Sequence, residues 1–262
     1  MTYDNLGYQT GDGVATRTLN RPQSYNALNP ALIQDLRAAL AAVEADSSVR
    51  AVVITGSGKG FCSGADLTAF SGDQDIGELL RAGLNPLILQ MRGLEKPIVC
   101  AVNGAAAGAG AGLALAADFR LASDRATFIF AAFAGIGLVP DSGVTVLLQQ
   151  IVGQAKAFEL CLLASAQQRL DAPNAQALGV VNRVVAHDDL LSEAQAFASQ
   201  LARMPTRAIG YTKRALYSAP GRTLEDALEY EAQMQAAAYQ TRDFQEGLAA
   251  FLEKREPVFT GE

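Results

Sequence analysis

Two stretches of small residues in this sequence are suited to holding negative charge on a carbonyl oxygen. Residues 60–67 read Gly-Phe-Cys-Ser-Gly-Ala-Asp-Leu and follow the apolar run 51–55. Residues 101–112 read Ala-Val-Asn-Gly-Ala-Ala-Ala-Gly-Ala-Gly-Ala-Gly and come at the end of the apolar run 97–102. Small residues let a ligand approach bare backbone N–H groups closely. Two convergent N–H groups would form an oxyanion hole. Composition alone favours a second explanation for residues 108–112, tight helix packing.

A third stretch supplies a carboxylate. Residues 137–143 read Gly-Leu-Val-Pro-Asp-Ser-Gly and place Asp141 at the start of a predicted helix. Asp141 could cap this helix, because Asp and Ser are favoured N-cap residues. It could instead move a proton beside the oxyanion hole. The local pattern favours the cap, although Ser142 could fill that role and leave Asp141 for chemistry.

The composition indicates an intracellular enzyme rather than a nucleic-acid-binding or membrane protein. The chain has 262 residues, of which 50% are apolar and 18% charged, and a net charge of −6. This charge gives no basic footprint for nucleic acid. Three widely spaced cysteines (Cys62, Cys100 and Cys161) do not suggest a disulfide framework. No apolar run reaches the roughly 20 residues needed to span a membrane, and no signal peptide is visible at the N-terminus. We expect a cytoplasmic protein.

The predicted elements change character near residue 189. Before it, strands alternate with helices, and the helix at 30–45 has Asn29 as its predicted N-cap. After it, every element is helical. This order predicts an α/β core over residues 1–200 and a helical region over 201–262. The predicted strands are 14–19, 49–55, 98–102, 119–123 and 180–185; the predicted helices are 30–45, 76–94, 109–117, 142–151, 155–164, 190–204, 206–218, 223–240 and 241–253.

Five motifs occur in an order that resembles the enoyl-CoA hydratase/isomerase (crotonase) superfamily nearly end to end. Besides 60–67 and 101–118, they include Leu-Asn-Arg-Pro at 19–22 with Asn-Ala-Leu at 26–28. The others are Ala-Leu-Gly-Val-Val at 177–181, and Phe-Gln-Glu-Gly at 244–247 followed by residues 250–255. The resemblance implies a spiral of strand-strand-helix repeats, with C-terminal helices that cover the site and form a homotrimer or a dimer of trimers.

The resemblance also implies a site for acyl-CoA thioesters, with no cofactor and no metal. Ser63 and Ala109 occupy the two oxyanion-donor positions, each through its backbone N–H. CoA contacts are inherited from the resemblance rather than read from the composition. The expected substrate-binding residues are Ser24, Tyr25, Ala27, Ala65, Asp66, Leu67, Gly110, Phe133, Phe251 and Lys254.

The sequence departs from the hydratases of the family at two positions. Hydratases use two glutamates, because adding water needs a base for oxygen and a proton for carbon. These glutamates would fall at Gly112 and Phe133, and both are missing. Asp141 follows Pro140, a pattern similar to isomerases of the family. One carboxylate suffices to move a proton between two carbons, and aliphatic walls should raise its pKa.

We therefore expect an acyl-CoA isomerase that resembles the ring-epoxide isomerases acting on 1,2-epoxyphenylacetyl-CoA, with Δ3-Δ2-enoyl-CoA isomerase ability. The alternatives are a 2-enoyl-CoA hydratase and a non-catalytic acyl-CoA-binding subunit. A dehalogenase is disfavoured, because the chain has no Trp and its single histidine, His187, is expected in an exposed loop. The acyl preference should depend on residues 73–84 and the helical tail.

Overall fold

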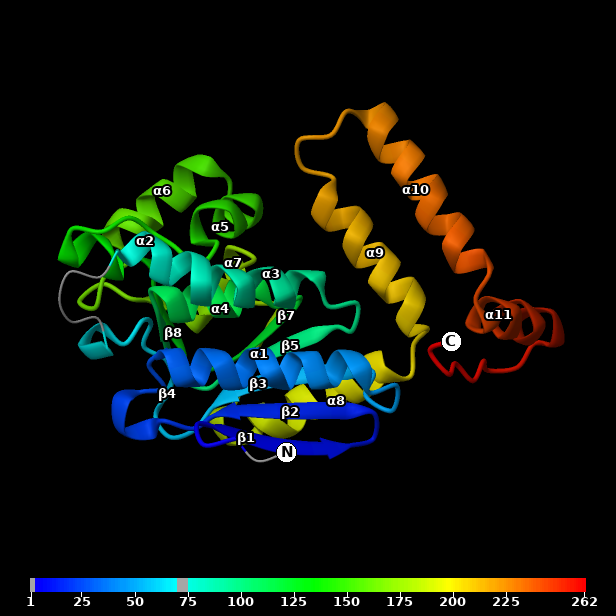
Figure 1. Ribbon diagram of the computed structural model, residues 1–262, viewed down its shortest axis with the longest axis horizontal. Helices are drawn as coiled ribbons and strands as arrows, with labels where there is room; N and C mark the ends of the chain where they lie inside the picture. The colour runs from blue at the N-terminus through cyan, green and yellow to red at the C-terminus, as the bar shows by residue number, and fades with distance from the viewer. Residues whose placement is uncertain (1–2, 70–74) are drawn as a thin grey trace.

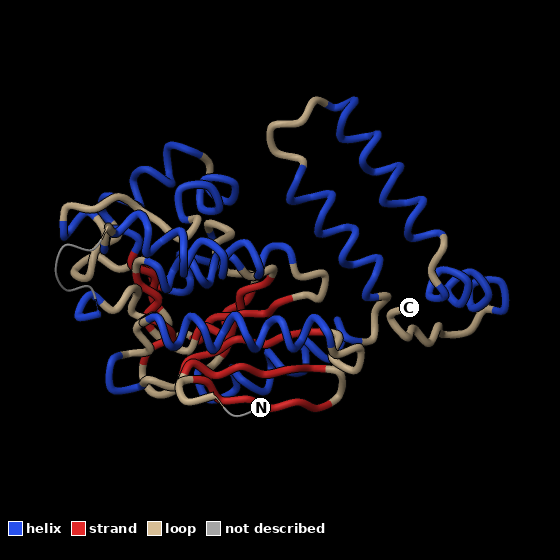
Figure 2. Tube along the Cα trace, in the orientation of Figure 1, coloured by secondary structure: helices blue, strands red, loops and turns tan. Residues whose placement is uncertain are grey.

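The computed structural model describes residues 3–69 and 75–262, which form two β-sheets covered by helices (Figures 1 and 2). The larger sheet has the strand order β1-β2-β3-β5-β7-β10. The first two strands pair antiparallel, and the remaining neighbours pair parallel. These strands are β1 (Leu6–Gly11), β2 (Val14–Leu19), β3 (Ala51–Gly56), β5 (Ile98–Val102), β7 (Phe119–Ser123) and β10 (Arg183–Val185).

A second sheet of very short strands produces the repeat that the resemblance implied. Its order is β4-β6-β8-β9, and β4, β6 and β8 each follow a strand of the larger sheet along the chain. Strand, strand and helix then recur in turn, so the predicted repeat is confirmed. The short strands are β4 (Gly60–Cys62), β6 (Ala105–Ala107), β8 (Thr127–Ile129) and β9 (Leu170–Asp171).

Helices cover both faces of the larger sheet, because its central strands are apolar on both sides. Val52 and Ile54 of β3 pack in one core with α1 (Pro30–Ala45), α3 (Asn85–Gly93) and α4 (Ala109–Ala116). Val53 packs in a second core with α8 (Leu190–Ala202). Parallel strands buried on both faces are expected to be apolar throughout.

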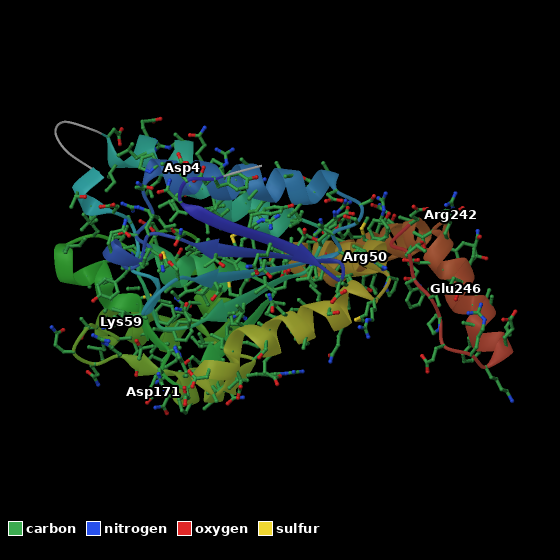
Figure 3. The ribbon with its side chains drawn as sticks, turned by 90° about the horizontal axis from the view of Figure 1, so that it is seen from below. Asp4, Arg50, Lys59, Asp171, Arg242 and Glu246 are labelled. Atoms are coloured by element: carbon green, nitrogen blue, oxygen red, sulfur yellow. The ribbon has the colours of Figure 1, made fainter. Side chains whose placement is uncertain are left out.

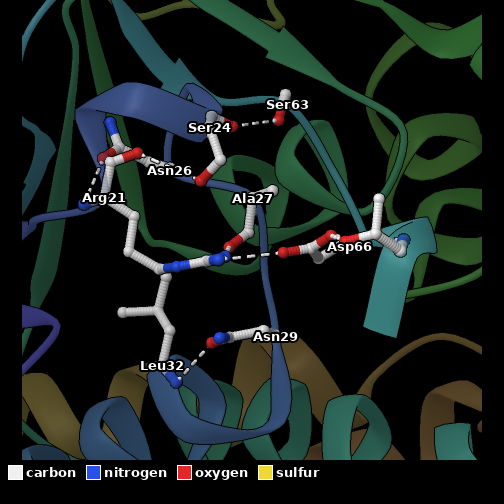
Figure 4. Close-up of polar contacts among 9 residues, drawn as sticks. Arg21, Ser24, Asn26, Ala27, Asn29, Leu32, Ser63 and Asp66 are labelled. Atoms are coloured by element: carbon white, nitrogen blue, oxygen red, sulfur yellow. Dashed lines mark hydrogen bonds and ion pairs between the residues drawn. The ribbon is translucent and has the colours of Figure 1, made fainter. Parts of the chain in front are cut away.

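Helix α1 has the predicted bounds and the predicted cap. The Asn29 side chain accepts a hydrogen bond from the backbone N–H of Leu32 at 2.9 Å (Figure 4). Pro30 follows at the first helical position, where its missing N–H costs nothing. The cap fixes the point at which the chain leaves the loop 22–28 and enters the helix.

The predicted helix at 76–94 is interrupted. It consists of α2 (Ile76–Leu79), a π-helical turn (Leu80–Leu84) and α3. Pro86 lacks a backbone donor, so a regular α-helical bond cannot form there. Residues 73 and 74, which belong to the stretch expected to set acyl preference, lie outside the described residues.

Three more helices follow β8 along the chain: α5 (Val144–Val152) and α6 (Gln154–Leu163) come before β9, and α7 (Ala172–Ala177) comes directly after it. Helix α5 begins two residues later than predicted. Its N-cap is Gly143, and no side chain caps it.

The C-terminal helices extend away from the sheets as a hairpin of two helices followed by a third helix (Figure 1). They are α9 (Thr206–Ser218), α10 (Leu224–Tyr239) and α11 (Arg242–Glu253). The buried Lys213 of α9 pairs with Asp118 at 3.0 Å, which fastens α9 to the core. Arg50, labelled in Figure 3 near the start of the tail, donates to Thr206 Oγ1 at 2.9 Å and to the carbonyl of Phe259 at 2.5 Å.

The predicted boundary at residue 200 lies within α8, and the division into two domains stays a prediction. All three cysteines are free thiols. Within the described part of the chain, no helix is long and apolar enough to cross a membrane.

Candidate active site

A cavity of about 910 Å³ lies between α1, the α2–α3 segment and the two small-residue loops. Ser63, Ala109 and Asp141 all line it, as do Ala65, Leu67 and Phe133. Most other described lining residues are apolar or small. Among the described lining residues, Asp141 has the sole acidic side chain and Arg37 the sole cationic side chain.

The two predicted oxyanion segments lie against each other. Ser63 follows β4, and Ala109 is the first residue of α4. A methyl group built on Gly64 would lie 3.5 Å from the backbone nitrogen of Ala109, so the two backbones are almost in contact. Gly110 is buried against the backbone of Cys62, where a side chain would clash. Gly110 therefore allows the loops to approach but does not line the cavity.

The two predicted donors differ in their hydrogen bonding. The backbone N–H of Ser63 donates to the carbonyl of Tyr25 at 3.0 Å. Ala109 stands in the first turn of α4, where backbone N–H groups have no partner within the helix. Among the described residues, none accepts a hydrogen bond from the Ala109 N–H. The N–H of Ala109 is thus available to donate to a ligand oxygen. The N–H of Ser63 could do so only by sharing its hydrogen bond with the carbonyl of Tyr25 or by giving that bond up.

The loop at 24–27 does not line the cavity. Figure 4 shows the polar contacts that this loop makes with Ser63 and, through Arg21, with Asp66. Ser63 Oγ donates to the carbonyl of Ser24 at 3.1 Å, and Tyr25 is 56% exposed. Arg21 pairs with Asp66 at 2.9 Å and donates to the carbonyl of Ala27 at 2.5 Å. These bonds tie the loop at 24–27 to residues 63–66.

Asp66 takes part in this network as an ionised group. The hydroxyl of Thr68 and the guanidinium of Arg21 lower its pKa. Its carboxylate is therefore occupied in holding the loop at 24–27.

Asp141 does not cap a helix. No side chain accepts a hydrogen bond from the first N–H groups of α5, and the hydroxyl of Ser142 donates to Asp141 Oδ1 at 2.8 Å. Both capping roles considered from the sequence are therefore wrong. Burial in the cavity wall raises the pKa of Asp141, although the Ser142 hydrogen bond opposes this effect.

Gly112 stands at the position of the first missing glutamate, and the turn at Ser142 occupies the space that a side chain there would need. A methyl group built on Gly112 would lie 2.7 Å from both Cβ and the carbonyl oxygen of Ser142. Real side chains do not approach so closely, so residue 112 cannot carry a longer side chain unless the turn moves. Phe133, at the second glutamate position, is buried and lines the cavity.

Three residues of interest lie away from the cavity. Phe251 and Lys254 are exposed on or just after α11, beyond the tail hairpin in Figure 1. Within one chain they do not meet the other candidate residues. His187, which was expected in an exposed loop, is half-buried, and its Nδ1 lies 3.0 Å from Ser123 Oγ.

Sequence reasoning missed Ser142 as a partner of Asp141, and it missed the polar end of the cavity. Gln34 and Arg37 of α1 and Gln90 of α3 form this end. The three-residue spacing of Gln34 and Arg37 puts them on one helix face, which was the available signal.

Comparisons with known proteins agree with this geometry. The profile described as "Enoyl-CoA hydratase/isomerase" matches residues 9–262. The 1,2-epoxyphenylacetyl-CoA isomerase of Escherichia coli K12 is 41% identical over 254 residues, which cover 95% of each chain. A Rhodobacter capsulatus protein named "Probable enoyl-CoA hydratase" is 41% identical over 262 residues and the full length of both chains.

The fold comparison gives the same class. The solved structure of enoyl-CoA hydratase subunit I from Geobacillus kaustophilus superposes with a TM-score of 0.92, at 32% identity, and covers 99% of each chain. The chain belongs to the enoyl-CoA hydratase/isomerase family and has the crotonase fold. It is therefore an enzyme of that family, whose relatives bear the names of both isomerases and hydratases.

Proposed function

We propose that this protein is an acyl-CoA isomerase in which Asp141 is the single acid/base and the backbone N–H groups of Ser63 and Ala109 hold the thioester oxygen, the Ser63 N–H leaving the carbonyl of Tyr25 to donate to it. The observation that carries the proposal is the charge of the cavity wall. Asp141 is its sole acid among the described residues, and Gly112 and Phe133 stand where hydration would require carboxylates.

Isomerisation needs no more than this set of groups. In a 3-enoyl-CoA, the Asp141 carboxylate takes a proton from C2, and the electrons move onto the thioester oxygen to give a dienolate. The two N–H groups stabilise that charge. The protonated Asp141 then returns the proton to C4, so the double bond moves to C2–C3 and no atom is gained or lost. Burial of Asp141 supports its use as a base, because a raised pKa makes it a stronger proton acceptor.

We favour the ring 1,2-epoxide of phenylacetyl-CoA as substrate, converted to its oxepin form, with 3-enoyl-CoA isomerisation as a related ability. The similarity to the Escherichia coli isomerase supports this choice. The apolar lining of the cavity supports it as well, since Phe133, Leu80 and Leu84 offer apolar contacts to a ring. No resident cofactor or metal enters this reaction scheme.

The proposal includes assembly into a homotrimer or a dimer of trimers in the cytoplasm. In the single chain α10 has no buried residue. Exposed apolar side chains occur along the tail, among them Leu216, Leu224, Leu228, Phe251 and Leu252. In such an assembly, Phe251 and Lys254 would reach the CoA bound to a neighbouring copy.

A comparison of two reactions tests the proposed activity. Purified protein is mixed with trans-3-hexenoyl-CoA in one assay and with crotonyl-CoA and water in the other. The proposal predicts rapid isomerisation and negligible hydration. Efficient hydration, with kcat/KM near ~10⁷ M⁻¹s⁻¹, would favour a hydratase. Tight acyl-CoA binding without either reaction, including on the ring epoxide, would favour a binding subunit.

A further inference from the structure

The turn that carries Asp141 is strained and closely packed. Ser142 has a φ of +52°, in the left-handed region that residues with a side chain rarely adopt. It is only 2% exposed. Strain of this kind persists only where the surrounding structure enforces it, and it is often found at functional sites.

Gly112 is the residue that makes room for this turn. A Cβ at position 112 would lie 2.7 Å from the Cβ and from the carbonyl oxygen of Ser142. Helix α4 and the turn therefore touch at a point where glycine is required. The contact holds Ser142 in a conformation from which its hydroxyl donates to Asp141 Oδ1 at 2.8 Å.

We propose that Ser142 is a positioning residue for Asp141, held in place by Gly112, and that its hydroxyl anchors Oδ1 so that Oδ2 carries the proton. This inference rests on the proposed isomerase function. Within the described chain, no other donor reaches the Asp141 carboxylate. A single anchored oxygen limits rotation of the carboxylate, so the other oxygen keeps one orientation toward the reacting carbons.

Other charged groups near the turn do not offer a competing anchor. Helices α4 and α5 and residues 130–138 contain no charged side chain. Arg81 in the π-helical turn pairs with Glu78, and Arg92 of α3 lies over the ring of Tyr217. Arg37, on α1, lines the same cavity and does not hydrogen-bond to Asp141.

Ser142→Gly and Ser142→Ala test the proposal. Both remove the hydroxyl, and glycine also accepts the positive φ without strain, so the glycine variant should fold even if the alanine variant does not. Thr145→Ala is the matched control, because it removes a hydroxyl from the exposed face of the adjacent helix α5. Isomerisation of trans-3-hexenoyl-CoA is followed across pH, together with Tm.

We expect Ser142→Gly to lower kcat by about 10-fold to 100-fold, the scale of loss for a catalytic group displaced by about 1 Å. The acidic limb of kcat/KM should also move to higher pH, because the lost hydrogen bond no longer favours the ionised carboxylate. Thr145→Ala should leave both quantities unchanged.

Two results would overturn the inference. One is a wild-type kcat and an unmoved acidic limb in Ser142→Gly. The other is a lower kcat in Ser142→Gly with the acidic limb of kcat/KM unmoved, which would mean that Ser142 acts through packing alone. Asp141→Asn, assayed alongside, separates this inference from the proposed function. If that variant is inactive while Ser142→Gly behaves as wild type, the positioning role alone fails; if it remains active, the acid/base assignment itself fails.

Discussion

At the scale of single residues, Asp141 experiences two opposing influences. Burial in the apolar cavity disfavours its ionised form, and the Ser142 hydroxyl favours it. Burial is the larger effect, so the pKa is raised. A base is most effective when its pKa lies near the working pH. The same desolvation that makes Asp141 useful as a base also makes its charge costly to the folded state.

The raised pKa of Asp141 predicts the acidic side of the pH profile. The ionised carboxylate is the form that accepts a proton, so kcat/KM for 3-enoyl-CoA isomerisation should fall as the pH drops through this pKa. The limb should lie above the ~3.9 of an ordinary aspartate. Steady-state rates across the acidic range measure it, with Tm as a check on folding. A limb at the ordinary value would contradict the effect of burial.

The stability of the fold should fall as the pH rises, whereas the activity should rise. A carboxyl group with a raised folded-state pKa stabilises the fold below its unfolded pKa, and this contribution is lost as the pH rises through the folded pKa. Asp141→Asn stays neutral throughout. Its Tm should therefore exceed that of the wild type at neutral pH and match it in acid. A variant less stable than the wild type at neutral pH would count against this account.

The sequence was sufficient to name Asp141, Ser63 and Ala109, which line one cavity. It could not show the bond from Ser142 to Asp141. Local pattern favours Asp or Ser as a helix cap, and the competing conformation is imposed by Gly112, 30 positions earlier in the chain. Contacts of that kind belong to tertiary structure and leave no local signal.

At the scale of elements, predictability followed length and periodicity. The 16-residue helix α1 and the 13-residue helix α9 have the bounds that their apolar spacing predicted. The short strands of the second sheet were not predicted from the residue pattern, although the resemblance implied the repeat, because each strand has only two or three residues. Alternation cannot be recognised over so few positions. These short strands nevertheless place the two oxyanion segments side by side.

The contact between α4 and the Asp141 turn predicts that hydration cannot be restored by one substitution. Gly112→Glu supplies the missing carboxylate type, but its Cβ would meet the backbone of Ser142. We expect lower Tm, loss of isomerase activity as Asp141 is displaced, and no hydration of crotonyl-CoA. Gly112→Ala separates the effect of the clash from that of the charge, and it should lose isomerase activity too. Efficient hydration of crotonyl-CoA by Gly112→Glu would contradict this prediction, because it would show that the turn at Ser142 can move to admit the side chain.

At the scale of the whole molecule, the tail is incompletely packed in a single chain. Amphipathic helices owe most of their stability to packing, yet no residue of α10 is fully buried. Lys213, Asp118 and Arg50 fix the base of the tail, while its apolar side chains face outward. The change from alternating elements to helices was readable in the sequence. The direction in which the α9–α10 hairpin extends from the core could not be predicted, because it depends on hydrogen bonds and an ion pair to residues distant in the sequence, such as Lys213 to Asp118 and Thr206 to Arg50.

The proposed assembly into a trimer or a dimer of trimers predicts a solution mass of three or six chains of 27.5 kDa. Leu228→Glu places a charge at an exposed apolar position of α10 and should shift the mass toward single chains while the far-UV circular dichroism is kept. Gln235→Glu adds the same charge on the same helix without removing an apolar side chain, and it should assemble. Light scattering after gel filtration measures both. A stable wild-type monomer would contradict the assembly.

The central claim is that Asp141 moves the proton, and Asp141→Asn tests it most directly. Asparagine keeps the size of the side chain and can still accept the Ser142 hydrogen bond, but it cannot take a proton from carbon. The account predicts that kcat for 3-enoyl-CoA isomerisation falls about 10²–10⁴-fold, while acyl-CoA affinity changes little and the fold is retained. A folded variant that keeps more than about a tenth of the wild-type rate, far above that expected loss, would contradict the claim.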